Sequence, residues 1–168
     1  MDGGLIMIKM SNLVFIKHKE LTDEMLQIIC EIKAVAWNYS LKEHEKWILK
    51  NIEESDIHVL LKENGVYVAY LNLININLLN SNNMLFNSLG IGNVCTRFEK
   101  KGYGSILIQG VNQYLLNEGK SGMLFCKKQL VNFYERNNYK IENENEENIF
   151  FMSFNNDCDK FLYNGKPF

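Results

Sequence analysis

Two lysines and two glycines stand together in the segment VCTRFEKKGYGSIL, where an apolar stretch ends and a helical pattern begins. The first-turn amides of a helix have no acceptor within the helix, and its N-terminus carries about half a positive charge. Gly102 and Gly104 would let an anion approach these amides, and Lys100 and Lys101 add mobile cations. The segment therefore predicts a phosphate-binding turn.

The spacing of these glycines fits neither of the common nucleotide motifs. A P-loop needs GxxxxGK[ST], and a dinucleotide fingerprint needs a third glycine, which position 107 lacks. A plain turn between a strand and a helix therefore stays open as the alternative. A second segment, FYERNNY, lies one strand later and predicts a short amphipathic helix with Phe133 inward and Tyr134 partly exposed.

Composition limits the classes of protein to which the chain can belong. With 168 residues, of which 46% are hydrophobic, it can bury one sizeable core, so we expect a single domain over 1–168, with 1–10 as a flexible N-terminus. A net charge of −2 argues against nucleic acid as a partner. No apolar run is long enough for a signal peptide or a membrane span, so we expect a cytoplasmic protein that does not contact membranes.

Four cysteines are scattered along the chain without a CxxC pair, at Cys30, Cys95, Cys126 and Cys158. No cluster of histidines accompanies them to complete a zinc site. We therefore expect free thiols and no bound metal.

Hydrophobic periodicity and turn signals predict the element order βααβββαβαββ. This order indicates an α/β (α+β) domain with a mixed, mostly antiparallel sheet of about seven strands and helices on both faces. The expected strands are 13–17, 56–62, 66–79, 84–96, 122–126, 139–143 and 148–154, and the expected helices are 23–37, 44–52, 105–119 and 129–137.

Local signals mark several of these elements. Thr22 or Asp23 can cap the first helix, and Ser40 with Glu43 predicts a capping box for the second. The glycines at positions 90 and 92 predict a bulge or a close backbone approach in the strand 84–96.

In this element order, EKKGYG and FYERNNY resemble two motifs of the GNAT family of N-acetyltransferases. In that family, Q/R-x-x-G-x-G/A opens a helix and a later helix has the form FYEKLGF. GIGNVCT is similar to the strand segment that leads into the cofactor loop. The resemblance covers about 56–141 and implies acetyl-coenzyme A as the donor, an amine of a small molecule or peptide as the acceptor, and direct transfer in a ternary complex.

The resemblance also implies roles for individual residues. The backbone of Gly92, Asn93 and Val94 would pair with the pantetheine arm, and an amide near Val94 would stabilise the oxyanion. Tyr134, with an ordinary pKa of about 10, would protonate a leaving thiolate whose pKa is about 8.5. The pyrophosphate would be cradled by Lys100, Lys101, Gly102, Tyr103, Gly104 and Ser105.

Two positions depart from the family pattern. Glu99 stands where Gln or Arg is usual, and it opposes phosphate binding unless it turns to solvent or pairs with Lys100 or Arg97. Asn138 replaces a glycine, which is a mild change because asparagine also tolerates a left-handed backbone.

The general base is not evident, because the strand 84–96 contains no Asp, Glu or His. His58 is the first candidate, since it alternates with apolar neighbours on its strand, although a histidine in a sheet is more often structural. Glu31, His44 and Glu45 are weaker candidates.

The acceptor pocket is expected between the first two helices. Trp37, Tyr39 and Trp47 offer an apolar or cation-binding surface there, although core packing explains the two tryptophans as well. A homodimer is expected by analogy with the family.

Three interpretations stay open. The chain is an N-acetyltransferase, a non-catalytic regulatory module that binds coenzyme A or a metabolite, or a structural domain without a cofactor.

Overall fold

The computed structural model describes residues 12–80, 82–156, 161–163, 165 and 168. The segment predicted to be flexible, 1–10, and Cys158 lie outside the described residues. The elements are β1 (Leu13–Lys17), η2 (His18–Glu20), α1 (Asp23–Ala36), α2 (Leu41–Asn51), β2 (Ile57–Glu63), β3 (Val66–Asn80), β4 (Leu85–Thr96), α3 (Tyr103–Asn117), β5 (Ser121–Lys127), α4 (Lys128–Glu135), β6 (Lys140–Glu144), β7 (Ile149–Phe154) and β8 (Phe161–Leu162).

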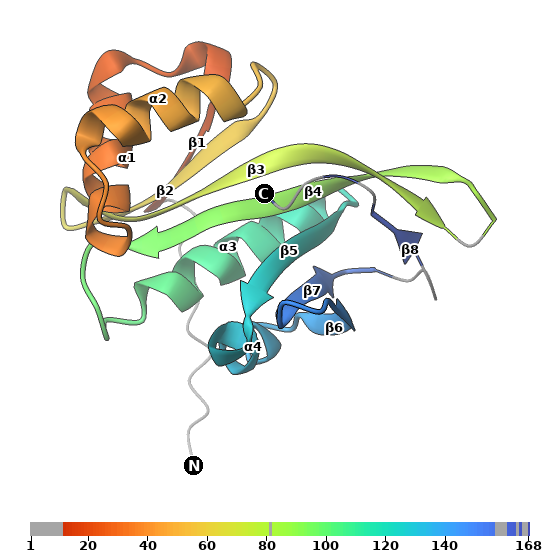
Figure 1. The fold of residues 1–168 in the computed structure, drawn as a ribbon. Helices are drawn as coiled ribbons and strands as arrows, with labels where there is room; N and C mark the ends of the chain where they lie inside the picture. Colours follow the sequence, from red (N-terminus) through yellow and green to blue (C-terminus); the bar gives the residue numbers. More distant parts are fainter. Residues whose placement is uncertain (1–11, 81, 157–160, 164, 166–167) are drawn as a thin grey trace.

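These strands form one sheet in the order β1-β2-β3-β4-β5-β7-β6, and the two-residue β8 pairs with β3 (Figure 1). Every pair is antiparallel except β4 and β5, and α3 makes the crossover that a parallel pair requires. The predicted fold class is therefore confirmed. Only η2 and β8 were not predicted, because elements of three and two residues are too short to show a period.

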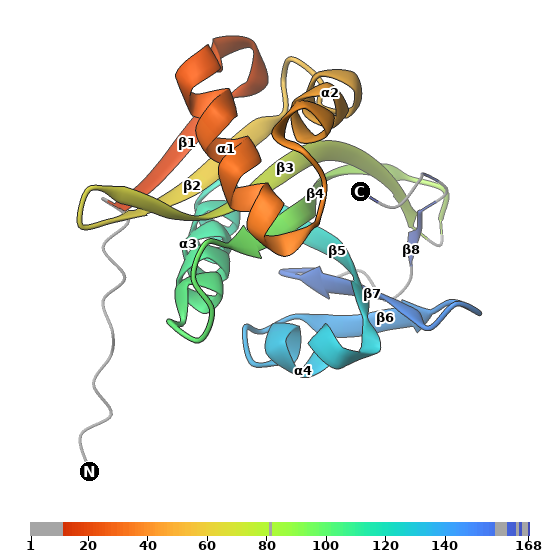
Figure 2. The same ribbon diagram turned by 60° about the vertical axis from the view of Figure 1, so that its left-hand side comes forward.

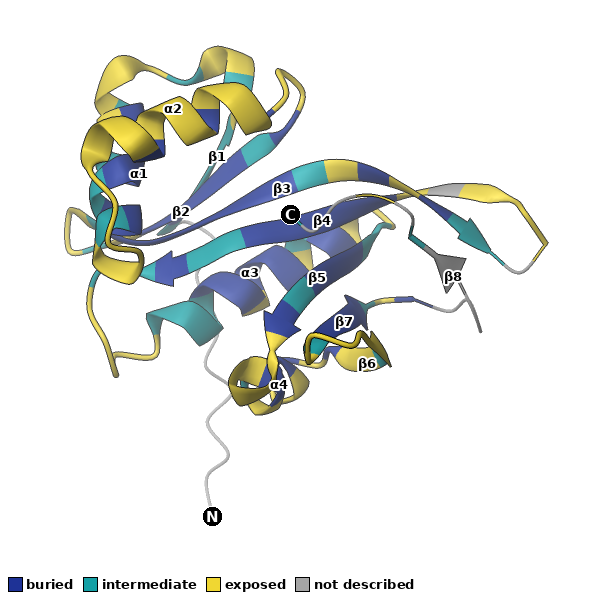
Figure 3. Ribbon diagram, viewed as in Figure 1, coloured by how far each residue is buried: buried dark blue, intermediate teal, exposed yellow. Residues whose placement is uncertain are grey.

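Alternate residues of the central strands face two different helical layers. On β2, Val59 and Leu61 pack in the cluster that contains α3, whereas Leu60 packs with α1 and α2. Figure 2 shows α1 lying across the strands on one face, and Figure 3 shows that both α1 and α3 contain buried positions. The apolar line of α3 is fully buried at Leu107, Val111 and Leu115.

The buried face of helix α1 differs from the face that its apolar residues alone predict. Val35 is 56% exposed, whereas Lys33 is only 3% exposed. Lys33 follows Leu26 and Ile29 at spacings of seven and four, which places all three on one face of the helix. A cation therefore occupies a core-facing position of α1.

Several predicted turns and caps are confirmed. The Thr22 side chain caps α1 by accepting a hydrogen bond from the Met25 amide, and Ser40 and Glu43 form the reciprocal capping box of α2. Asn138, the departure from the expected glycine, adopts a left-handed φ of 68°. Local hydrogen bonding was sufficient to predict these features.

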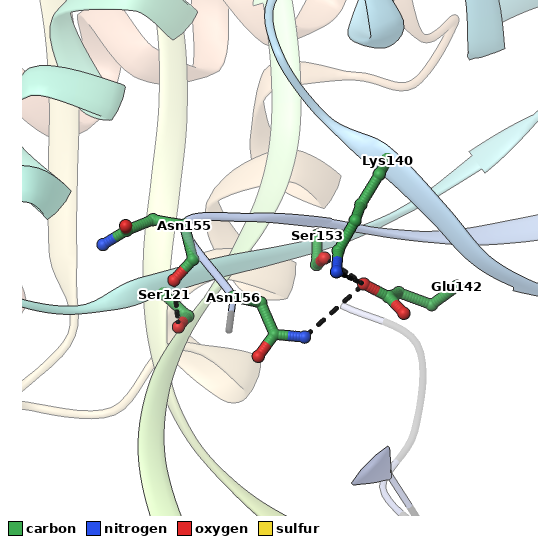
Figure 4. A network of polar contacts seen from close by, with 6 residues as sticks. All are labelled: Ser121, Lys140, Glu142, Ser153, Asn155 and Asn156. Atoms are coloured by element: carbon green, nitrogen blue, oxygen red, sulfur yellow. Dashed lines mark hydrogen bonds and ion pairs between the residues drawn. The ribbon is translucent and has the colours of Figure 1, made fainter. Parts of the chain in front are cut away.

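Polar contacts lie along β6 and β7 and at the start of β5 (Figure 4). Glu142 accepts hydrogen bonds from Ser153 and Asn156 and forms an ion pair with Lys140 at 3.4 Å. The Ser121 hydroxyl donates to the backbone carbonyl just after β7 at 2.7 Å. These contacts fix β5, β6 and β7 as one unit.

His58 on β2 is fully buried and has hydrogen-bond partners at both ring nitrogens. Its Nε2 lies 2.9 Å from Nδ1 of His18, and its Nδ1 lies 2.8 Å from the Tyr70 hydroxyl. Burial lowers the pKa of His58 to about 4, and the neighbouring His18 and then Lys33 add to the effect. His58 is therefore neutral at pH 7 and enclosed within the fold.

We expect Leu107→Ala to lower the free energy of unfolding by about 2–5 kcal/mol, because it leaves a cavity between α3 and the sheet. Leu116→Ala is the matched control on the same helix, since Leu116 is 50% exposed and its truncation costs within about 0.5 kcal/mol. Urea unfolding followed by circular dichroism measures both. Equal losses would contradict the packing of α3 described above.

We expect His58 to make the fold sensitive to acid. Between pH 6.5 and about 4 the unfolded chain binds a proton at this residue that the folded chain does not, so stability falls as the pH falls. Relative to His58→Gln, the wild type should lose about 3 kcal/mol over this range, from 1.36 kcal/mol per pKa unit. Urea titrations at a series of pH values test this, and parallel stability curves for the two proteins would contradict it.

Candidate functional site

The parallel strands β4 and β5 separate after a short pairing. The ladder joins Ser88, Leu89 and Gly90 to 121–123, and beyond it the strands run apart toward their carboxyl ends (Figure 1). The facing backbone groups beyond this point have no partner from the other strand. Backbone groups that a sheet leaves unpaired in this way can bind an extended ligand, which pairs with them as another strand would.

Two cavities lie along this separation. The central cavity has a volume of about 580 Å³, and the loop cavity, beside the start of α3, has about 430 Å³. Val94, Leu130 and Tyr134 border both cavities, so the two meet at these residues. The central cavity is also lined by Lys33, Trp37, Tyr39, Glu43, His44, Trp47, Ile91, Gly92, Asn93, Phe125 and Phe168, and the loop cavity by Cys95, Thr96, Phe98, residues 100–105 and Phe133.

The loop before α3 and the first turn of α3 together contain all six residues predicted to bind phosphate, and all six line the loop cavity. Lys100 and Gly102 both have left-handed backbones, with φ of 57° and 76°, and Gly102 is the N-cap of α3. The first intrahelical donor is the amide of Ile106, which bonds to the Gly102 carbonyl. The three preceding amides, at 103–105, therefore have no acceptor within the helix and line the loop cavity.

Gly104 keeps the wall of the loop cavity open. A Cβ at this position would lie 3.4 Å from Phe133 Cζ and 3.8 Å from Thr96 Cγ2, which is ordinary contact. Alanine therefore fits here, whereas a larger side chain extends into the space between the loop and α4.

Strand β4 bulges where the two cavities meet. Pairing with β3 steps from Gly92 opposite Asn72 to Cys95 opposite Tyr70, so β4 has one extra residue. Asn93 in this bulge has a φ of 54°. A bulge of this kind turns backbone and side-chain groups away from the hydrogen-bonded ladder between the strands. The irregularity predicted near the glycines of β4 is confirmed.

Phe168 explains why these positions of β4 are glycine. A Cβ on Gly90 would lie 2.6 Å from the Phe168 ring, and one on Gly92 would lie 3.0 Å from the Phe168 carbonyl carbon. Phe168 also packs edge-on against Phe125, with ring centroids 5.3 Å apart. The sequence analysis anticipated a close approach here but did not identify the residue that makes it.

Tyr134 is more buried than the sequence suggested, with 6% exposure, and Phe133 is the more exposed of the pair. Burial, with a smaller effect of Cys126, raises the pKa of Tyr134 above its ordinary value. Its hydroxyl therefore stays protonated at neutral pH. Among the described residues it has no hydrogen-bond partner, so it is available as a donor where the cavities meet.

Lys33 is the site residue that sequence reasoning missed. Its Nζ donates to Asn93 Oδ1 at 2.5 Å and lies 4.3 Å and 5.3 Å from the ring centroids of Trp47 and Trp37. Asn93 in turn donates to Asn72 Oδ1 at 2.6 Å. Burial lowers the pKa of Lys33 to about 8. The helical spacing from Leu26 was the signal that could have revealed this lysine.

The residues predicted for the acceptor pocket, Trp37 and Tyr39, both line the central cavity. Trp37 and Trp47 are 36% and 39% exposed, so core packing does not account for them. The cation that these two tryptophans contact is the chain's own Lys33.

His44 also lines the central cavity and is 4% exposed. Its Nε2 lies 3.2 Å from the Trp37 carbonyl oxygen. Because a carbonyl can only accept, this nitrogen carries the proton, and in the neutral ring Nδ1 is left as the acceptor. The hydrogen bond to Trp37 fixes the orientation of the His44 ring, so His44 is a candidate for the general base.

Neither cavity is lined by His58, the first candidate for the base, nor by Glu31 or Glu45. Glu31 pairs with Arg97 at 3.2 Å, and Glu45 lines a separate hollow beside α1 and α2. Glu99 is exposed and does not line the loop cavity, which is the solvent-facing arrangement that leaves phosphate unopposed.

The three described cysteines, Cys30, Cys95 and Cys126, are buried free thiols, and burial raises the pKa of each to about 11 or 12. Within the described part of the chain, no group of three or more His, Cys, Asp or Glu side chains is placed to hold a metal ion. No helix of that part is both long and apolar enough to cross a membrane.

No protein-family model matches the chain, and no curated protein sequence is significantly similar to it. Solved structures are similar in fold. An acyl-CoA N-acyltransferase from Pseudomonas aeruginosa superposes with a TM-score of 0.63 at 17% identity, covering 84% of this chain and 97% of that one. The N-acetyltransferase PseH of Campylobacter jejuni in complex with acetyl coenzyme A gives 0.59 at 16% identity, covering 84% and 97%.

A GCN5-related N-acetyltransferase from Kribbella flavida gives a TM-score of 0.61 at 16% identity, over 77% of this chain and 34% of that one. At such identities the likeness concerns the fold, and it agrees with the element order and with the motifs at 99–104 and 133–139. The chain has the fold of the GNAT N-acetyltransferases.

Proposed function

We propose that this protein is an acetyl-CoA-dependent N-acetyltransferase that acts on a primary amine of a small molecule or peptide. The observation that carries the proposal is that Val94 and Tyr134 border both cavities. A ligand with phosphate at one end and a reactive thioester at the other can therefore lie along the separation of β4 and β5 and reach both. Structures of similar fold include one in complex with acetyl coenzyme A.

The phosphate end is held at the loop cavity. The free amides of Tyr103, Gly104 and Ser105 donate to the pyrophosphate, and the helix N-terminus stabilises its charge. Lys100 and Lys101 are exposed on the same loop and supply cations that salt screens. Glu99, turned to solvent, does not oppose them.

The thioester end is held at the β4 bulge. Backbone groups of Gly92, Asn93 and Val94 pair with the pantetheine amides, and the Val94 amide stabilises negative charge on the carbonyl oxygen during attack. Acetyl-CoA, as co-substrate, supplies the acetyl group as a thioester. Tyr134 donates the proton that the departing sulfur needs, since its hydroxyl is protonated and has no described partner.

The acceptor amine enters the central cavity between α1 and α2, beside Trp37 and Tyr39. His44 takes its proton, directly or through water, because the Trp37 carbonyl selects the neutral tautomer in which Nδ1 is the acceptor. His44 replaces His58 in this role, since His58 lies outside the cavity. A homodimer and a cytoplasmic location remain predictions from the sequence.

We expect calorimetric titration with acetyl-CoA to show binding that weakens as salt is raised. Gly104→Val should weaken it at least tenfold, about 1.4 kcal/mol, because the valine side chain fills the loop cavity. Gly104→Ala is the matched control and should stay within a few-fold of the wild type, since its Cβ makes only ordinary contacts. A wild type that binds no coenzyme A species would favour a structural domain without a cofactor.

We expect Tyr134→Phe and His44→Gln each to reduce turnover by roughly 10²-fold or more while acetyl-CoA affinity changes little. Thiol release with a panel of amines, including an amino acid, a polyamine, an aminoglycoside and a peptide, measures the rate. His58→Gln is the matched control and should keep its rate at pH 7, where it stays folded. Unchanged turnover in Tyr134→Phe would remove the assigned acid, and no turnover in the wild type with any amine would favour the regulatory module.

A further inference from the structure

The central cavity already contains an amine. Lys33 Nζ is held by Asn93 Oδ1 at 2.5 Å, with the rings of Trp47 and Trp37 close to it. An ammonium surrounded in this way is fixed in one place rather than mobile on the surface. Lys33 and Asn93 line the central cavity together with Val94, which also borders the loop cavity, so this amine faces the space proposed for the thioester.

We propose that Lys33 is itself an acetylation site, whose Nζ receives the acetyl group from acetyl-CoA bound between β4 and β5. This inference rests on the proposed function. It concerns a reaction that needs no second substrate, and it adds a modified residue to the chain.

Burial of Lys33 favours the neutral amine that such a reaction needs, whereas the Asn93 hydrogen bond and the tryptophan rings favour the ammonium. Among the described residues no carboxylate forms an ion pair with it, and its hydrogen-bond acceptor is a neutral amide. Cys30 and Cys95 nearby are protonated thiols, because burial raises the pKa of both. At the Lys33 pKa of about 8, half of the side chains are neutral at pH 8, whereas an ordinary lysine is neutral in roughly 1 molecule in 300.

The step balances without any further reactant. The neutral Lys33 nitrogen attacks the thioester carbonyl carbon, an N–C bond forms, and the C–S bond breaks. The proton lost by the nitrogen replaces the one that Tyr134 gives to the leaving sulfur. The products are acetyl-lysine and coenzyme A thiol, with no change of oxidation state.

Acetylation changes the cavity in two ways. It removes the only lysine charge among the described residues that line the central cavity, so the contact with the tryptophan rings loses its electrostatic component. It also adds the volume of an acetyl group to the space proposed for the acceptor. The modified protein should therefore acetylate other amines more slowly than the unmodified one.

Incubation of the full chain with acetyl-CoA, without any other amine, tests this proposal by mass spectrometry. Cleavage after Glu31 and Glu43 releases 32–43, which carries both Lys33 and the exposed Lys42. One peptide thus contains the site and its internal control. We expect Lys33 to be acetylated at least tenfold faster than Lys42, at a rate constant independent of protein concentration.

Two further experiments distinguish acetylation by bound acetyl-CoA from the intrinsic chemical reactivity of Lys33. S-Acetyl-N-acetylcysteamine, a thioester without the nucleotide, should not reproduce the preference for Lys33. Gly104→Val should reduce acetylation of Lys33 at least tenfold and leave Lys42 unchanged. Equal labelling of Lys33 by both donors would overturn the proposal, because it would show intrinsic reactivity alone.

Calorimetry on the same sample tests the proposed function, which needs acetyl-CoA binding, separately from the self-acetylation of Lys33. Binding of acetyl-CoA without preferential acetylation of Lys33 overturns self-acetylation and leaves the proposed N-acetyltransferase standing. No binding of acetyl-CoA overturns both.

Discussion

The separation of β4 from β5 is the constraint on which the rest of the structure depends. A continuous ladder between them would satisfy their backbone groups and close the sheet, whereas pairing ends after three residues of each strand. The sheet thus has two halves, β1-β2-β3-β4 and β5-β7-β6, and each half must be stabilised by pairing among its own strands. The long antiparallel pairing of β3 with β4 holds one half, and the pairing of β5 with β7, with the polar network around Glu142, holds the other. The opening is stable because neither half needs the other to complete its strands.

The bulge links this backbone constraint to the side chains of the site. The extra residue in β4 puts Asn93 into a left-handed conformation, from which its amide reaches both Asn72 and Lys33. Asn72 Nδ2, at the end of this chain of hydrogen bonds, is buried and has no hydrogen-bond partner among the described residues. An unsatisfied buried donor has a cost in stability. It lies under the proposed site, where such departures from ideal folding are expected.

Local signals in the sequence were sufficient to predict the elements and the left-handed turn at Gly102 that is proposed to bind phosphate. Capping at Thr22 and Ser40 and the glycines of the loop act within a few residues, so their geometry can be inferred from spacing alone. The base could not be inferred in this way. His44 and His58 look alike in sequence, and only the packing of α2 against the cavity separates them. Lys33 was missed because a charge on an apolar face is read as exposed until its partners, 4 to 60 residues away, are known.

The position of Lys33 also bears on why β4 can dispense with a carboxylate. An acceptor ammonium that enters the central cavity meets the Lys33 ammonium in a partly desolvated space. A like charge nearby and burial both lower the pKa of an amine, as they do for Lys33 itself. In the proposed reaction this effect of Lys33 favours an acceptor that has already lost its proton, whereas the Glu43 carboxylate, which also lines the cavity, acts in the opposite direction. The site therefore combines a buried cation with a carboxylate on α2, and neither belongs to β4.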